Sequence, residues 1–282
     1  MSTDQLTVPR QSSRHDRGDD DHTDAQRIFN LVPSRDTGAD WGLGDALAAR
    51  DLRAGPVLPE SVDLRAGWWG VGDQENTGSC VGWATADGVL RHTLVTAGLL
   101  DEATRLSPRY IWMASKERDE FDQRPETFIE ESGTSLKAAV DIARKYGVVD
   151  DADPPFHLTT KMYVGSGNAF FARAAQRRIR YYNLGRDLDA WKHWLAGTGP
   201  ILAGFSVDAA WMNATATDGR VDGFDAATVR GGHAVTIVGY LPDGWFIVRN
   251  SWGTGWGDGG FAYVSPGYIE QAFFSESYGV RA

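Results

Sequence analysis

Residues 74–84, QENTGSCVGWA, contain Cys80, the single cysteine of the 282-residue chain. A lone thiol forms no intramolecular disulfide and cannot build a thiolate zinc site by itself, so Cys80 is either a small buried hydrophobic residue or a nucleophile. A cysteine becomes a useful nucleophile as a thiolate, and both a helix N-terminus and a nearby imidazolium lower its pKa. Apolar residues recur at three- to four-residue spacing after Cys80, which predicts a helix over residues 81–99.

The imidazole that such a thiol needs is best supplied by His233. It lies at the start of a strongly β-forming run, GGHAVTIVGY (231–240), behind two glycines that permit close approach of another backbone. Asn250 ends the next predicted strand, and a turn around residues 243–244 would place it on a neighbouring antiparallel strand. A catalytic imidazole needs a partner on its second ring nitrogen, and Asn250 can be that partner.

Two more side chains complete the candidate site. Acyl transfer requires donors for an oxyanion, and Gln74 could donate alongside the backbone N–H of Cys80. Trp252 could cover the hydrogen bond between His233 and Asn250 and keep water from it. Taken singly, Cys80 could be an inert buried residue and His233 a strand-end histidine bound in a turn.

The order of the predicted elements indicates the fold class. Helical patterns occupy residues 108–117 and 135–145, with shorter ones at 168–180 and 186–196. Short β-rich runs bounded by Gly, Pro and Asp follow and are typical of an antiparallel meander, at residues 199–207, 232–241, 244–250 and 259–265. Helices followed by strands predict an α+β protein with two lobes that meet at a cleft.

The chain divides into three parts. Residues 1–27 are polar and lack an apolar period, so we expect a disordered tail. Residues 28–57 carry apolar anchors with Gly and Pro but little regular pattern, which predicts an extended strap against the main body. Residues 58–282 form the main domain, in which we expect a helical lobe over about 58–165 and a β-rich lobe over about 166–282.

Three blocks of sequence resemble the signature blocks of the papain-like cysteine peptidases, the family of papain and the cathepsins. They are LPESVDLRAGWWGVGDQENTGSCVGWA (58–84), GGHAVTIVGY (231–240) and VRNSWGTGWGDGGFAYV (248–264), and they occur in the family's order. The resemblance covers residue 58 to about 282. It implies a papain-like two-lobe α+β fold, with an N-terminal helical lobe, a C-terminal antiparallel β lobe and the active-site cleft between them. It also implies a cysteine endopeptidase that works through a thioester acyl-enzyme, with no cofactor and no metal.

Carried over residue by residue, the resemblance makes Cys80 the nucleophile and His233 the general base and acid. Asn250 matches the orienting residue and Gln74 the oxyanion donor. The substrate-binding positions that it implies are Gly78, Ser79, Gly133, Ala234 and the shielding indole of Trp252. Gly133 would pair with the substrate backbone, although a simple turn glycine is an alternative interpretation.

The chain departs from the family pattern at three positions. Thr77 replaces the usual half-cystine, Val81 replaces the tryptophan after the nucleophile, and Gly232 replaces the acidic residue that often precedes the histidine. We therefore expect a bacterial-type member that is stabilised by packing without disulfides. The segment before residue 58 is short for the propeptides of the family. Autoinhibition by a prosegment-like strap over residues 28–57 is accordingly a hypothesis.

Net charge and apolar composition limit which classes of partner and which locations are expected. The formal net charge of −10 disfavours nucleic acid and anionic membranes as partners, so we expect a peptide or protein substrate. The sequence makes no prediction of oligomeric state. No apolar run reaches the roughly 18 residues of a membrane span, and the N-terminus has no signal-peptide apolar region. A cytoplasmic location is the default expectation, with signal-less export open.

Two alternative functions remain at this stage. A peptide acyl-transferase, that is, a transpeptidase or peptide-maturation enzyme, would form the same acyl-enzyme and pass it to an amine. A non-catalytic peptide-binding module would keep the groove but not need the complete set of Cys80, His233, Asn250 and Gln74.

Overall fold

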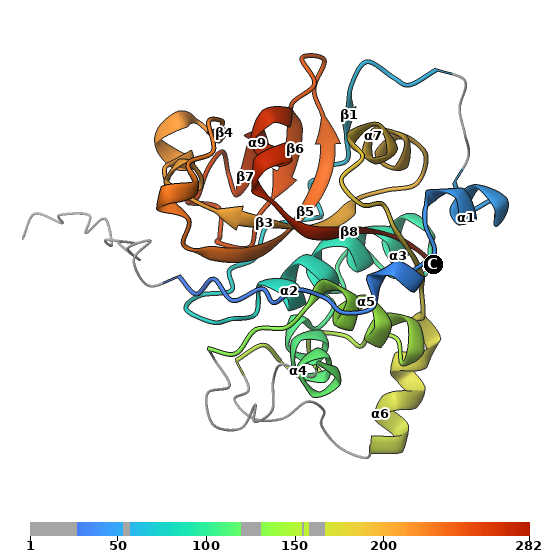
Figure 1. Ribbon diagram of the computed structural model, residues 1–282. Helices are drawn as coiled ribbons and strands as arrows, with labels where there is room; N and C mark the ends of the chain where they lie inside the picture. The colour runs from blue at the N-terminus through green and yellow to red at the C-terminus, as the bar shows by residue number, and fades with distance from the viewer. Residues whose placement is uncertain (1–26, 53–56, 120–130, 154, 158–166) are drawn as a thin grey trace, which may run out of the picture.

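The computed structural model describes residues 27–52, 57–119, 131–153, 155–157 and 167–282. The predicted tail therefore lies outside the described residues except for Arg27. Helices lie mainly on one side of the molecule and strands on the other (Figure 1). The helical elements are η2 (Thr37–Ala39), α1 (Leu43–Ala48), α2 (Cys80–Trp83), the π-helix η3 (Ala84–Leu90), α3 (Arg91–Thr96), α4 (Pro108–Arg118), α5 (Leu136–Lys145), α6 (Gly167–Ala174), η4 (Ala175–Arg177), α7 (Leu188–Gly197), α8 (Ala209–Met212), η5 (Ala214–Thr217), η6 (Ala226–Thr228) and α9 (Pro266–Ala272).

The strands form one sheet in the order β2-β8-β3-β5-β6-β7-β4, and β1 pairs with β5 outside this path. Their bounds are β1 (Val62–Asp63), β2 (Arg180–Asn183), β3 (Ile201–Val207), β4 (Arg220–Val221), β5 (Gly231–Tyr240), β6 (Phe246–Arg249), β7 (Phe261–Val264) and β8 (Phe273–Arg281). Neighbouring strands are antiparallel apart from the short β4–β7 pair. This arrangement confirms the predicted α+β class.

A buried helical run over residues 80–96 forms the centre of the molecule. It consists of α2, η3 and α3 in succession, which confirms a helix after Cys80, although the run ends at Thr96 and not at the predicted residue 99. Its residues are buried on all sides from Cys80 to Leu94, as expected of a helix enclosed by other elements. A Cβ atom at Gly82 would lie 2.9 Å from the Cβ of Trp112, so only glycine lets α4 cross the helix this closely.

The middle of this helical run is a π-helix that packs against strand β5. Gly88 has φ −81° and ψ −106°, which breaks the helical geometry. At this kink Thr236 of β5 donates a hydrogen bond from Oγ1 to the carbonyl oxygen of Ala84, at 3.1 Å. This hydrogen bond joins the helix and β5 across the two lobes.

Residues 27–52 cross the molecule between the sheet and the helices α2, α4 and α5, as the blue segment of Figure 1 shows. The first part is extended, and the backbone N–H groups of Leu31 and Val32 donate to the carbonyl oxygens of Gly232 and Thr134 at 3.1 and 3.2 Å. We call residues 27–33 the cleft segment.

The second part, residues 36–52, contains η2 and α1, and we call it the anchored segment. Tyr182 donates from its hydroxyl to Asp51 at 2.6 Å, and Tyr278 donates to Asp40 at 2.8 Å. Ala46 and Leu52 are buried in the core cluster of the sheet. The predicted strap thus includes short helices and contributes side chains to the core.

We expect Gly279→Ala to lower the free energy of unfolding by about 1–3 kcal/mol, because overpacking a filled core costs this much. A Cβ at Gly279 of β8 would overlap the indole ring of Trp194. Urea unfolding followed by circular dichroism measures the change. Gly267→Ala in α9 is the matched control, because nothing lies within 4 Å of its Cβ position and alanine favours the helix. Equal unfolding curves for the two variants would contradict the packing described for β8.

Candidate active site

Cys80 is the first residue of α2 and is completely buried. Burial raises the pKa of its thiol to about 11, because the thiolate would lose its hydration. The backbone N–H groups of Ala234, Val81 and Cys80 itself act in the opposite direction by favouring the thiolate. Ala234 directly follows His233 in β5, so the predicted nucleophile and the predicted base lie at one junction between helix and sheet.

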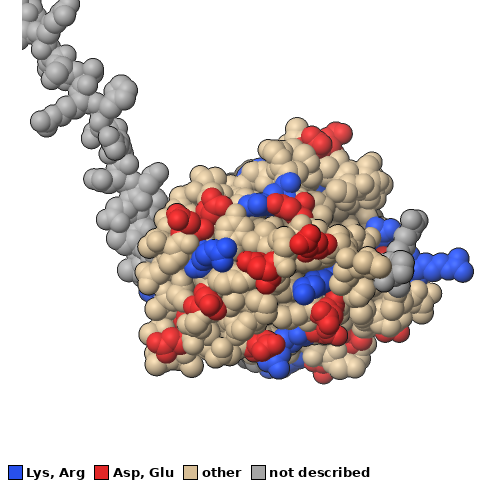
Figure 2. All heavy atoms as spheres, turned by 90° about the horizontal axis from the view of Figure 1, so that it is seen from above, with Lys and Arg blue, Asp and Glu red and all other residues tan. Residues whose placement is uncertain are grey.

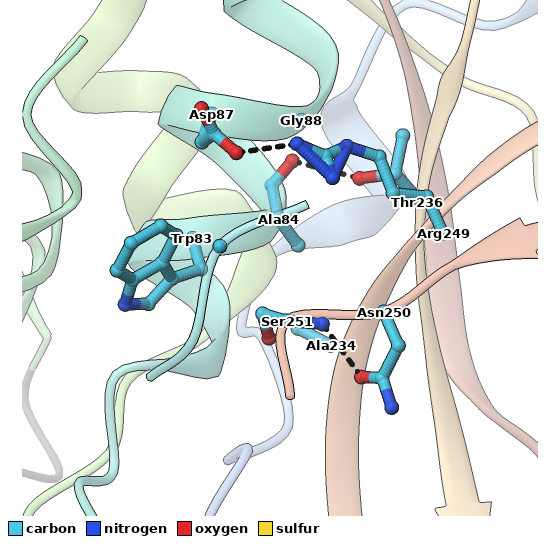
Figure 3. Close-up of a pocket in the computed structure, with 10 residues that line it drawn as sticks. Trp83, Ala84, Asp87, Gly88, Ala234, Thr236, Arg249, Asn250 and Ser251 are labelled. Carbon is cyan, nitrogen blue, oxygen red and sulfur yellow. Dashed lines mark hydrogen bonds and ion pairs between the residues drawn. The ribbon is translucent and has the colours of Figure 1, made fainter. Parts of the chain in front are cut away.

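His233 and Asn250 form the hydrogen bond that the sequence predicts. Nε2 of His233 lies 2.7 Å from Oδ1 of Asn250, which directly follows β6. The backbone N–H of Ser251 donates to the same Oδ1 at 2.8 Å, so this atom is the acceptor (Figure 3). Nε2 therefore carries the hydrogen, and Nδ1 is the basic nitrogen of the neutral ring. Among the described residues this buried Nδ1 has no hydrogen-bond partner.

The environment of His233 keeps its imidazole neutral. Burial lowers its pKa to about 4, the hydrogen bond with Asn250 partly offsets this, and the positive charge of Arg27 lowers the pKa further. With the thiol of Cys80 also shifted toward its neutral form, both groups are uncharged near pH 7 in this covered state.

Gln74 is held in one orientation by residues on both sides of it. Its Nε2 donates to the carbonyl oxygen of Thr77 at 2.9 Å, and its Oε1 accepts from the Ser251 hydroxyl at 2.8 Å. An amide group has two hydrogens on Nε2, so one remains to be offered to a substrate oxygen. Thr77 also donates to the Gln74 carbonyl and contacts the hydroxyl of Ser79, each at 2.6 Å. Hydroxyl hydrogen bonds thus stabilise the loop before Cys80 at position 77, where the resemblance had implied a half-cystine.

Trp252 lies against the imidazole. Its ring centroid is 4.9 Å from that of His233, with an interplanar angle of 38°, and the side chain is 3% exposed. On its other sides it contacts Trp256 at 5.5 Å and Phe29 at 5.8 Å between centroids. The indole therefore separates the bond between His233 and Asn250 from solvent.

Two of the predicted substrate-binding residues, Gly78 and Gly133, lie against the cleft segment. A Cβ atom at either Gly78 or Gly133 would overlap Asn30, so both glycines admit this residue between them. A Cβ at Gly232 would lie 2.9 Å from the carbonyl oxygen of Leu31. The absence of a side chain at these positions lets an extended backbone pass between Gly78 and Gly133 and alongside Gly232, the residue before His233.

Sequence patterns missed the contacts of the cleft segment. Leu31 is 4% exposed and belongs to the same core cluster as Cys80 and Ala234. Phe29 contacts His233 at 6.4 Å between ring centroids, and Arg27 forms an ion pair with Asp73 at 2.7 Å. The two glycines before His233 indicated close backbone approach and residues 28–57 were predicted to form a strap, but no local signal indicated which part of the strap enters the cleft.

Among the residues that the structure describes, no cluster of three or more His, Cys, Asp or Glu residues could hold a metal ion. No helix in that part of the chain is long and apolar enough to cross a membrane. On the face seen from above in Figure 2, acidic and basic side chains are interspersed.

Comparisons with known proteins give one consistent result. Residues 58–277 match the family model described as "Papain family cysteine protease". The chain is 25% identical to "Cathepsin B-like CP2" of Giardia intestinalis over 243 residues, which make up 78% of this chain and 73% of that protein. It is 31% identical to "Macrodontain-1" of Ananas macrodontes over 122 residues, or 42% of this chain and 52% of that protein.

Solved structures show the same fold. Xylellain, a cysteine protease from Xylella fastidiosa, is similar with a TM-score of 0.73 and 22% identity, covering 91% of this chain and 97% of that chain. ProCathepsin B S9 from Trypanosoma congolense is similar with a TM-score of 0.63 and 18% identity, covering 90% of this chain and 86% of that chain. These similarities confirm the papain-like two-lobe fold.

We expect iodoacetamide to alkylate Cys80 slowly in the folded chain, with a rate that rises with pH toward about 11, because the reactive thiolate is scarce below the raised pKa. Leu31→Asp would put a carboxylate into an apolar site and displace the cleft segment. We expect this variant to react at least roughly tenfold faster at pH 7. Leu47→Asp, at a 40% exposed position of the anchored segment, is the control. Equal rates in all three proteins would show that the segment does not protect the thiol.

Proposed function

The chain belongs to the papain family of cysteine proteases, and we propose that it is an endopeptidase in which Cys80, His233, Asn250 and Gln74 carry the reaction. The observation that supports this most directly is the fixed imidazole. Ser251 and Asn250 together place the hydrogen on Nε2 of His233 and leave Nδ1 as the base. His233 directly precedes Ala234, whose backbone N–H acts on the Cys80 thiol. An imidazole fixed in this tautomer next to Cys80 is the base that a cysteine nucleophile requires.

The reaction follows from these positions. Once water and substrate reach the site, the proton of the Cys80 thiol passes to Nδ1 of His233, and the thiolate attacks the peptide carbonyl carbon. The oxyanion accepts hydrogen bonds from Gln74 Nε2 and the Cys80 backbone N–H. The C–N bond then breaks, the amine leaves with the proton from Nδ1, and a thioester remains. Water gives a proton to Nδ1 as it attacks the thioester, and that proton returns to the sulfur as the acid leaves.

The groove is suited to an extended peptide or protein substrate. The backbone of the cleft segment already hydrogen-bonds to Gly232 and Thr134, on opposite sides of the groove. A substrate that replaces it would make the same kind of strand-like contacts, as the predicted role of Gly133 requires. The mixed charges of the surface in Figure 2 and the negative net charge support a peptide over a nucleic acid or an anionic membrane.

In the same way, we propose that the cleft segment keeps the enzyme latent. It fills the groove beside Cys80, and it also excludes the water that a thiolate and an imidazolium need. The thiol pKa near 11 and the imidazole pKa near 4 mean that the proton stays on sulfur while the segment is in place. Latency would then have two sources, exclusion of substrate and suppression of the ion pair.

We expect Leu31→Asp in the full chain to hydrolyse a fluorogenic peptide at least roughly tenfold faster than the unchanged chain, because substrate and water gain access to the site. The double variant Leu31→Asp with Cys80→Ala should have no activity and the same circular dichroism spectrum. Activity that survives loss of the thiol would refute Cys80 as the nucleophile.

A second experiment separates hydrolysis from the two alternative functions. Ligated peptide, detected by mass spectrometry with added amines, indicates acyl transfer. Labelling of Cys80 without turnover indicates a binding module.

We expect the free energy of unfolding to fall as the pH decreases from about 6.5 to about 4. The native pKa of His233, and that of His92 beside Trp69, is lowered to about 4, so the unfolded chain takes up protons first. Stability is therefore retained above pH 6.5 and lost below it, by about 1.4 kcal/mol per pH unit for each histidine. Urea titrations of Cys80→Ala between pH 4 and 7.5 measure this. His92→Gln should remove about half of the slope, and a flat profile would contradict the burial of both imidazoles.

A further inference from the structure

A buried ion pair joins the helix of Cys80 to the strand that precedes Asn250. Asp87 lies in the π-helical part of the helix, and Arg249 is the last residue of β6. Nη2 of Arg249 pairs with Oδ2 of Asp87, and the two side chains are only 3% and 4% exposed. A small cavity lies between the helix and strands β5 and β6. Figure 3 shows the ion pair on one side of this cavity and Asn250 on the other.

The partners of Asp87 distinguish its two oxygens. Oδ1 accepts from Arg91 at 3.1 Å, one turn further along the same helical run, whereas Oδ2 faces Arg249 from the sheet. Arg249 also donates to the carbonyl oxygen of Gly70 at 2.9 Å, and its guanidinium carbon lies 4.9 Å from the centroid of Trp69. One oxygen of Asp87 thus stabilises the helix locally, and the other connects the two lobes.

The position of Arg249 in the sheet makes this connection rigid. Arg249 pairs with Thr236 in the β5–β6 ladder, and Thr236 is the residue that donates to the carbonyl oxygen of Ala84. Two paired residues on adjacent strands therefore reach the same helical segment, one by a hydrogen bond and one by an ion pair. The cavity that they border is also lined by Ala234, Asn250 and Ser251.

We propose that the Asp87–Arg249 ion pair is a positioning device for Asn250, an inference that rests on the proposed function. The backbone leaves β6 at Arg249, and the next residue must direct Oδ1 at Nε2 of His233. Because Arg249 is fixed to the helix that begins at Cys80, the same contact sets the place of Asn250 relative to the nucleophile. Arg249 touches no reacting atom and acts through its neighbour.

The test uses Arg249→Met in the full-length Leu31→Asp chain, with Arg91→Met as the matched control. Both variants remove one buried arginine from Asp87 and leave the other to neutralise it. We expect Arg249→Met to lower kcat about tenfold with KM unchanged within twofold, because a displaced Asn250 supports the imidazolium poorly. The pH midpoint of Cys80 alkylation should rise by about one unit, which means about tenfold less thiolate at any pH well below the midpoint. Arg91→Met should leave the midpoint unchanged.

The outcomes distinguish failure of the proposed function from failure of the positioning role of Arg249. If the Leu31→Asp parent cleaves no peptide, the proposed function fails whatever Arg249 does. If the parent is active and Arg249→Met keeps the parent's kcat and midpoint, or if Arg91→Met shifts the midpoint equally, the positioning role is overturned. Should Arg249→Met fail to fold by circular dichroism, Arg249→Lys and Arg91→Lys replace the pair. A smaller rise of the midpoint in Arg249→Lys alone would then support the role, and no rise would overturn it.

Discussion

The contact between the buried helix 80–96 and strand β5 is the constraint on which the rest of the site depends. The helix delivers Cys80, and β5 delivers His233, so any change in their packing changes the distance between thiol and imidazole. Gly88 and Thr236 meet at this contact, and Thr236 donates a hydrogen bond to the carbonyl oxygen of Ala84 in the π-helical turn. The π-helical turn is thus the part of the helix that β5 contacts by a side-chain hydrogen bond.

Burial has opposite consequences for packing and for chemistry at this junction. The cleft segment packs Leu31 into the core cluster that includes Cys80, it packs Phe29 against the ring of His233, and this stabilises the fold. The same contacts remove the water that a charged thiolate and imidazolium need, which explains why the two pKa values move apart in the unproductive direction. A site that is well packed in this state is for that reason poorly prepared for proton transfer.

Much of this arrangement could be predicted from local sequence pattern, because a regular spacing of apolar residues is visible within a few residues of the chain. The helix after Cys80 and strands β3, β5, β6 and β7 fall where the apolar runs are. β8 was not predicted, since FFSESYGVR has no clear alternation and its place depends on pairing with β2 and β3. No sequence pattern indicated that Asp87 is buried and paired with an arginine. A carboxylate in a helix usually faces solvent, and only the fold brings Arg249 to it from 162 residues away.

The anchored segment gives the protein a property that a separate inhibitor would not have. Asp40, Asp51, Ala46 and Leu52 hold residues 36–52 to the body independently of what lies in the groove. A cleft segment that leaves the groove would stay tethered and return at an effective concentration on the order of millimolar. Peptides would then compete with it in proportion to their abundance and affinity, so half-maximal turnover would need a higher substrate concentration than the open site alone. Such an enzyme would respond to how much unfolded or extended chain surrounds it, with no need for a cut in its own backbone.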